Sequence, residues 1–294
     1  MAEGLTLRQD YFADPKAFQA LADLLHDVFG IDIALQNTLG GPDPTSMPFG
    51  YFDEAGRCVA NFSAFSMPLR VNGRLVRAAG YQSGAVRQDF RGQGLYRQLM
   101  MLAFDRAKAQ GFEAGILLTD KPALYEPYGF RVVPQFRSGG EAPEVRPSGP
   151  VGRTLDLTIG SDLHLVRQIL RQRQPVSDIF SPVRQMEMFL LNARLDPQCR
   201  LTLLPLHGAV IAWKTDGKAT LQILDIVAPS LPSVVEICAA LGGDFKRIEV
   251  CFPTDRLDWA GVAMPHAGSC VLMLQGIDPD FTLQPWMLSP MAEF

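Results

Sequence analysis

The chain has 294 residues, of which 47% are hydrophobic, and a formal net charge of −4 at pH 7. This length suits about two domains of ordinary size. The mild acidity argues against a protein that binds nucleic acid through its phosphate backbone, and no apolar run is long enough to span a membrane. The start lacks the basic and apolar blocks of a secretory signal, and the five scattered cysteines form no C-x-x-C pair. We therefore expect a cytoplasmic protein with reduced thiols and no metal site.

The first half is predicted to be a helix followed by an antiparallel meander. Apolar residues at spacings of three and four, the last of them Phe29, predict a helix with one buried face within residues 15–35. Strand candidates follow at 48–52, 57–71 and 74–86, and Asn72-Gly73 between the last two suits a type I′ turn. Helical spacing from Leu95 to Gly111 then leads to a buried strand at 113–118, which predicts a parallel crossover.

The second half repeats this order of elements without repeating the residues. Residues 134–150 are rich in Gly, Pro, Ser and Glu and predict a linker, so the expected domains are 1–145 and 152–294. Helices are predicted at 162–172, 183–192 and 234–241, and strands at 200–206, 209–214, 220–227, 247–252 and 270–276. The predicted fold class is α/β (α+β), with two tandem domains that each combine a meander with a parallel β-α-β unit, the second copy being degenerate.

A glycine loop stands between the meander and its crossover helix. Arg91-Gly92-Gln93-Gly94 would place free backbone N–H groups at a helix N-terminus, which suits a phosphate. A dinucleotide fingerprint needs a third glycine where Arg97 stands, and a Walker loop needs Gly-Lys-Ser/Thr, which is absent. On the loop alone, a polar turn before a core helix remains an alternative.

The stretch from Val86 to Leu95 resembles motif A of the GNAT acetyltransferases, whose consensus is Q/R-x-x-G-x-G/A. Arg91 and Gly94 match it, and Tyr96 replaces the final small residue. A second stretch, Leu124-Tyr125-Glu126-Pro127-Tyr128-Gly129-Phe130, resembles the family's L-Y-x-x-x-G-F signature. The two motifs cover about residues 80–131 and imply the GNAT fold. The tandem layout is similar to that of the enhanced-intracellular-survival acetyltransferases, without their sterol-carrier-like domain.

The resemblance implies acetyl-CoA as a co-substrate and assigns roles to twelve residues. The pyrophosphate would be held by Arg91, Gly92, Gln93, Gly94, Leu95 and Tyr96, and the pantetheine by Ala85, Val86, Thr119 and Asp120. For Asp120, the alternative is an N-cap of a short helix at 121–125. Tyr125 occupies the family's acid position, where a phenol can protonate the leaving thiolate, and packing beside Phe130 is its alternative.

The C-terminal tail, with Trp286, Met287, Leu288, Met291 and Phe294, is too apolar for a frayed terminus. The resemblance implies that the Phe294 carboxylate reaches Tyr125 and serves as the base, and packing as a last strand is the alternative. The expected function is acetyl transfer to a primary amine of a small molecule, and a non-catalytic acyl-CoA sensor or interaction protein is the second hypothesis. The acceptor, the acyl length and the oligomeric state, a homo-oligomer included, stay open.

Overall fold

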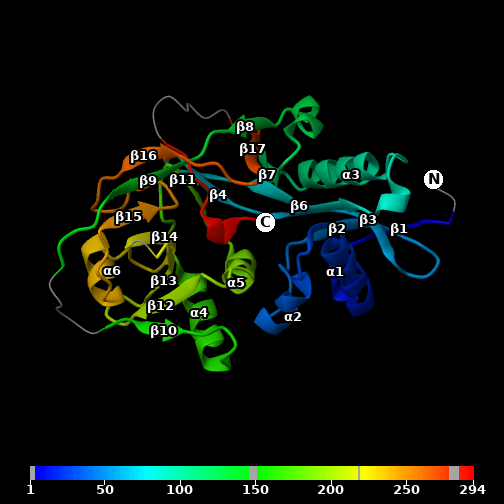
Figure 1. Cartoon of the computed structure of the whole chain (residues 1–294). Helices are drawn as coiled ribbons and strands as arrows, with labels where there is room; N and C mark the ends of the chain where they lie inside the picture. Colours follow the sequence, from blue (N-terminus) through cyan, green and yellow to red (C-terminus); the bar gives the residue numbers. More distant parts are fainter. Residues whose placement is uncertain (1–3, 146–150, 218, 278–284) are drawn as a thin grey trace.

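The residues that the structure describes form two seven-stranded mixed sheets and one three-stranded sheet (Figure 1). The computed structural model describes residues 4–145, 151–217, 219–277 and 285–294. The predicted mixed α/β class is confirmed, and both halves contain a meander followed by a parallel β-α-β unit.

The first sheet has the strand order β1-β2-β3-β6-β7-β17-β8. Its strands are β1 (Thr6–Gln9), β2 (Met47–Phe52), β3 (Cys58–Ser66), β6 (Ala78–Val86), β7 (Ala114–Thr119), β17 (Val271–Gln275) and β8 (Arg131–Val133). Neighbours pair antiparallel except β6 and β7, which are parallel and joined by helix α3 (Leu95–Ala109). This strand–helix–strand unit carries the glycine loop.

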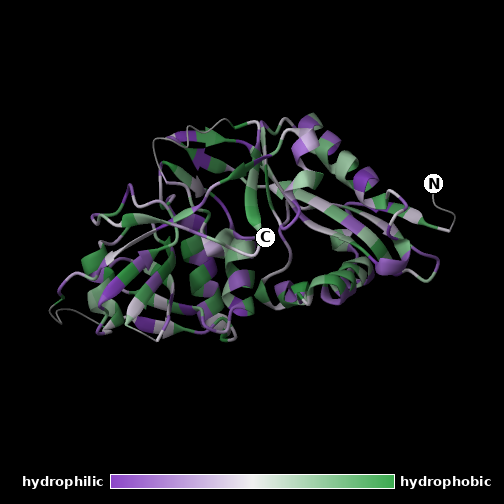
Figure 2. Cartoon of the chain, turned by 45° about the horizontal axis from the view of Figure 1, so that its top comes forward, coloured by the Kyte–Doolittle hydropathy of each residue, from purple (hydrophilic) through white to green (hydrophobic). Residues whose placement is uncertain are grey.

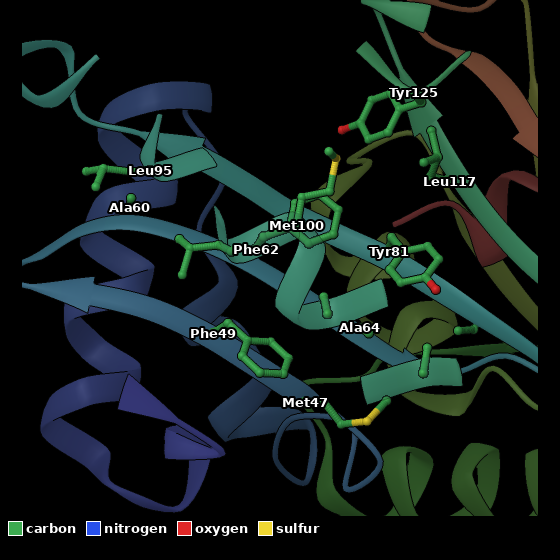
Figure 3. Packing of buried hydrophobic residues seen from close by; sticks show 14 of the residues in the cluster. Met47, Phe49, Ala60, Phe62, Ala64, Tyr81, Leu95, Met100, Leu117 and Tyr125 are labelled. Carbon is green, nitrogen blue, oxygen red and sulfur yellow. The ribbon is translucent and has the colours of Figure 1, made fainter. Parts of the chain in front are cut away.

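Helices α1 (Pro15–Phe29) and α3 cover opposite faces of the first sheet (Figure 1). Both helices contain polar as well as apolar residues along their length (Figure 2). The core on the α3 side includes Phe62, Tyr81 and Tyr125 (Figure 3). Helix α1 ends earlier than predicted, because Gly30 adopts a φ of 71° and donates its N–H to the His26 carbonyl at 2.8 Å. Residues 33–39 form a short 3-10 helix and the four-residue α2 (Gln36–Leu39). Phe29, expected on the buried face, is 52% exposed.

The second sheet repeats the plan of the first. Its strands, in sheet order, are β10 (Arg153–Leu155), β12 (Arg200–Leu204), β13 (Ala209–Thr215), β14 (Thr220–Val227), β15 (Arg247–Val250), β9 (Phe136–Glu141) and β16 (Val262–Pro265). Only β14 and β15 are parallel, and α6 (Val234–Leu241) connects them. Helices α4 (Gly160–Gln172) and α5 (Met186–Leu195) precede the meander.

Each half supplies one strand to the sheet of the other. Strand β17 lies between β7 and β8, and β9 lies between β15 and β16. The prediction that residues 134–150 are a linker is therefore wrong at β9. The glycines there allow close packing, since a Cβ at Gly140 would lie 2.9 Å from Cζ2 of Trp259. The division into domains 1–145 and 152–294 stays a prediction. Each of the two large sheets contains strands from both of these ranges.

The three-stranded sheet ties the halves together. It has the order β11-β4-β5, with β11 (Phe180–Pro182), β4 (Leu69–Val71) and β5 (Arg74–Val76). The predicted strands 57–71 and 74–86 are therefore each split between two sheets. The predicted turn is confirmed, with positive φ at Asn72 and Gly73. Strand β11 was not predicted, and the helix expected at 183–192 begins at Met186 instead.

The C-terminal tail lies between the halves and contains no strand in residues 285–294, so the alternative of a last strand is wrong. The Trp286 carbonyl accepts from the Phe136 N–H at 2.8 Å, and the Gln135 Oε1 accepts from the Leu288 N–H at 2.8 Å. The Ser289 hydroxyl donates to the Leu224 carbonyl at 2.9 Å, and residues Pro290–Ala292 form a 3-10 turn. Contacts with β9 and β14 of the second sheet, and with Gln135 just before β9, thus fix the path of the tail.

Candidate active site

The glycine loop leaves the N-terminus of α3 open. Gly92 and Gly94 have φ of 78° and 76°, a region that favours glycine, and no side chain caps the helix. The first backbone N–H groups of α3 are therefore free to bind an anion. A cavity of about 350 Å³ lies here, lined by Val86, Phe90, Arg91, Gly92, Gly94, Leu95, Tyr96, Arg97, Met100, Leu124 and Tyr128. Gln93 belongs to the same turn but not to this lining.

The matching helix of the second half has no such site. Ser233 accepts a hydrogen bond from the Glu236 N–H of α6, and the Glu236 carboxylate accepts one from the Ser233 N–H. This capping box uses the N–H groups that α3 leaves free. The local geometry agrees with a degenerate second copy.

Strands β6 and β7 separate beside the loop. In the described part of the chain, their parallel pairing runs only from Ala78–Ala114 to Tyr81–Leu117. Ser83 has a φ of 58°, and its carbonyl accepts a hydrogen bond from the buried Asn61 Nδ2 at 2.8 Å. Asn61 in turn accepts from the Tyr11 hydroxyl at 2.5 Å. This network, which the sequence analysis missed, fixes the bulge that turns the end of β6 away from β7.

A second cavity, of about 660 Å³, opens between these separated strands. Ala85 and Val86 line one side, and Thr119, Asp120 and Tyr125 line the other. Val86, Arg91, Tyr96 and Leu124 line both cavities. The structure thus brings eleven of the twelve predicted site residues, all except Gln93, to two cavities with shared walls.

The Tyr125 hydroxyl is hydrogen bonded to that of Tyr96, and Tyr125 is 6% exposed. Burial raises the pKa of Tyr125, and the hydrogen bond with Tyr96 partly offsets this effect. Burial also raises the pKa of Tyr96, and the same hydrogen bond raises it further. The Tyr125 ring also packs edge-on against Phe130, with centroids 6.0 Å apart, which is the packing contact expected as the alternative to an acid role. The acid role stays a prediction.

Asp120 does not cap the short helix after β7, so that alternative is wrong. The 3-10 helix Pro122–Leu124 has Lys121 at its N-cap position and no side-chain cap. It is the Thr119 hydroxyl that accepts the Lys121 N–H, at 3.0 Å. Asp120 instead lies in the cavity wall with Lys121, whose Nζ is 3.8 Å from the Asp120 carboxylate.

The end of the chain forms another part of the wall. Glu293 and Phe294 both line the larger cavity, with Tyr125. The Phe294 ring packs against Phe65, with centroids 5.0 Å apart, and the Glu293 carbonyl accepts from Asn192 Nδ2 at 2.7 Å. Burial raises the pKa of the Glu293 carboxyl. Sequence analysis singled out Phe294 and missed Glu293.

The family assignment rests on this fold together with the sequence. A family model described as an acetyltransferase (GNAT) domain matches residues 14–133, so this part of the chain is similar to that family. The uncharacterized N-acetyltransferase YhbS of Escherichia coli K12 is 39% identical over 80 residues, which is 27% of this chain and 46% of YhbS. The chain thus spans about half the length of this curated relative.

Solved structures show the same fold over nearly the whole chain. A probable N-acyltransferase from Enterococcus faecalis V583 covers 92% of this chain with a TM-score of 0.60 and 12% identity, over 72% of its own length. Eis1 from Mycobacterium abscessus covers 91% with a TM-score of 0.55 and 14% identity, also over 72% of its own length. At these identities the likeness concerns the fold.

Two further properties bear on the site. Among the described residues, no helix has the length and apolar character needed to cross a membrane. Across the same residues, no three His, Cys, Asp or Glu side chains are grouped so as to hold a metal ion.

Proposed function

We propose that the chain is an acetyl-CoA-dependent N-acetyltransferase that transfers an acetyl group to a primary amine of a small molecule. The observation that carries the proposal is the shared wall of the two cavities. It connects an uncapped helix N-terminus, suited to the pyrophosphate, with Tyr125, an acid suited to the thiolate. Acetyl-CoA is a co-substrate here, and Ala85, Val86, Thr119 and Asp120 would line the path of its pantetheine arm.

The proposed reaction is a direct attack in a ternary complex. The amine nitrogen attacks the thioester carbonyl carbon, and a backbone N–H at the end of β6 stabilises the developing oxyanion. A C–N bond forms and the C–S bond breaks, with the electron pair leaving on sulfur. Tyr125 gives its proton to that sulfur, and the proton lost by the amine goes to a base. Tyr125 then regains a proton from solvent.

In a chain that ends at Phe294, we propose the carboxylate of this residue as the base. Its support is that Phe294 and Tyr125 line the same cavity and that the tail reaching it is well packed.

The test is incubation with acetyl-CoA and a panel of primary amines. Amine-dependent release of free thiol, with the acetylated amine identified by mass spectrometry, is the expected result. Coenzyme binding by calorimetry without turnover of any amine would contradict the proposal and favour a sensor. Parallel assays with propionyl-CoA and butyryl-CoA determine the preferred acyl length.

A further inference from the structure

The larger cavity continues past the tyrosine pair to a wall of apolar side chains. Helix α1 and the turn after it supply Leu25, Val28, Phe29 and Ile31, and α5 supplies Leu191 and Leu195. Phe29, Ile31 and Leu195 are 52%, 40% and 38% exposed. Large apolar side chains that share one concave surface and remain accessible are typical of a ligand site.

Glu293 stands out among the charged residues of this cavity. The Asp43 carboxylate accepts hydrogen bonds from the Thr45 N–H and hydroxyl at 2.7 and 2.6 Å. Asp120 and Lys121 lie beside each other, and Arg91 belongs to the phosphate end. The Glu293 side chain forms no hydrogen bond or ion pair with any residue that the structure describes, although its backbone carbonyl is held by Asn192 of α5. Lys214, whose Nζ lies 3.1 Å from the Asp196 carboxylate, attracts Glu293 electrostatically. Glu293 is therefore a half-buried carboxyl group in a cavity wall with no hydrogen-bonded partner among the described residues.

A carboxylate in such a place favours a cation, and the proposed reaction supplies one, because an amine acceptor arrives as an ammonium ion. The rest of the acceptor then meets the apolar wall. A second charge on the acceptor would have to be buried there without a partner, which is costly. Glu293, whose carboxylate forms no hydrogen bond with a described residue, and the apolar wall of α1 and α5 together favour an acceptor with one charge and an apolar body.

We infer that the acceptor is a monoamine with an aliphatic or aryl substituent, whose ammonium group binds Glu293 and whose apolar part packs against α1 and α5. This inference rests on the proposed function and deepens it. It gives Glu293 a role in binding the acceptor that is separate from the roles of Tyr125 and Phe294.

A chain-length series tests the inference. We expect kcat/KM for n-alkylamines from propylamine to hexylamine to rise by roughly threefold to fourfold per methylene. Diaminohexane, which matches hexylamine in length, should be the poorer substrate by about tenfold or more, because its second charge meets the apolar wall. A flat series, or a preference for diaminohexane or spermidine, would overturn the inference and leave the proposed function intact. If no amine releases thiol, the proposed function fails and the inference fails with it.

Variants test the charged part and the apolar part of the acceptor site separately. Glu293→Gln should raise KM for hexylamine by about tenfold and leave KM for acetyl-CoA nearly unchanged. Phe29→Ser should flatten the chain-length series, whereas Leu206→Ser, an exposed residue outside the cavity, should not. Unfolding curves show whether each variant is folded. An unchanged amine KM in folded Glu293→Gln, or an unchanged series in folded Phe29→Ser, would contradict the assignment.

Discussion

The hydrogen bond between Tyr96 and Tyr125 joins the proposed acid to the helix that follows the glycine loop. Tyr96 follows the glycine loop on α3, and Tyr125 follows the 3-10 helix after β7. When the Tyr96 hydroxyl donates, the Tyr125 oxygen accepts and its own proton is free for the leaving thiolate. The bulky Tyr96, which departs from the family consensus, thus supports the proposed acid.

Replacing the acid should slow the chemical step and spare coenzyme binding. We expect Tyr125→Phe to lower kcat by about a hundredfold or more, with little change in KM for acetyl-CoA. Tyr96→Phe, which removes only the supporting donor, should lower kcat by about tenfold. Steady-state kinetics measure both. Equal kcat values for the wild type and Tyr125→Phe would remove Tyr125 from the acid role.

The pH profile offers an independent check on Tyr125. Burial raises its pKa above the ordinary value of 10.0, so the phenol stays protonated below that pH. The proton should therefore be available across the neutral and mildly alkaline range, and its loss should not reduce kcat below pH 10.0. An alkaline fall in kcat at a lower pH, present in the wild type and absent in Tyr125→Phe, would contradict this assignment.

Asn61 is the residue through which the bulge in β6 should control coenzyme binding. Asn61→Ala leaves the Ser83 carbonyl and the Tyr11 hydroxyl without their partner, at a cost of about 1–3 kcal/mol in the free energy of unfolding. Because the bulge positions Ala85 and Val86, KM for acetyl-CoA should rise more than KM for the amine. Ser63→Ala is the matched control, since Ser63 accepts from the same Asn61 amide and its replacement leaves Asn61 in place to hold the Ser83 carbonyl. Equal effects of the two variants on KM for acetyl-CoA would contradict the role of Asn61.

These residues differ in how well the sequence revealed them. Arg91, Gly94 and Tyr125 lie in contiguous motifs, so their neighbours in the chain indicate their place. Asn61 and Ser83 are 22 positions apart and meet only because β3 and β6 pair. Glu293 was missed for a similar reason. A single carboxyl group near the end of the chain matches no sequence motif, and its position at the cavity depends on how the tail packs.

At the scale of elements, the tail is the segment whose position has the clearest functional consequence. Its side chains from Trp286 to Leu288 are buried, and Trp286 stacks on Phe180 with ring centroids 4.6 Å apart. This packing holds Glu293 and Phe294 at the cavity, where the carboxylate of Phe294 is proposed to act as the base.

Extending the chain by a few residues after Phe294 tests that role. The extension moves the terminal carboxylate away, and we expect kcat to fall by about a hundredfold while KM for acetyl-CoA stays nearly constant. The same residues added before Met1 serve as the control, and unfolding curves check that both proteins remain folded. Unchanged turnover would rule out the Phe294 carboxylate as the base and leave the proposed acid unaffected.

Helices, strands and turns were predictable where residues close in sequence determine them. They were not predictable where contacts between distant parts of the chain determine them. Helical spacing revealed α1, α3 and α4, and Asn72-Gly73 revealed its turn. Strand β9 was missed because Gly139 and Gly140 resemble a linker in sequence, although the structure needs them for close packing against Met264 and Trp259. The division of predicted strand 57–71 between β3 and β4 depends on β11, which is more than 100 residues away and pairs with β4.

At the scale of the whole molecule, each half completes its sheet with a strand from the other half, β17 in the first sheet and β9 in the second. Strand β17 contributes Leu272, Met273 and Leu274 to the first sheet, and all three are at most 2% exposed. It pairs with β7 and β8 on its two sides. Neither half can complete its sheet from its own residues.

A fragment of residues 1–145 should therefore not fold alone, even though it contains the whole matched GNAT domain and both motifs. Without β17, strands β7 and β8 lose their common neighbour, and β9 is left with no sheet to join. We expect the fragment to show no cooperative unfolding transition and no binding of acetyl-CoA by calorimetry. Co-expression with residues 151–294 should restore both, because the second fragment brings β17 and receives β9. Cooperative unfolding and coenzyme binding by the fragment alone would contradict this interdependence and support the predicted boundary as a true division between domains.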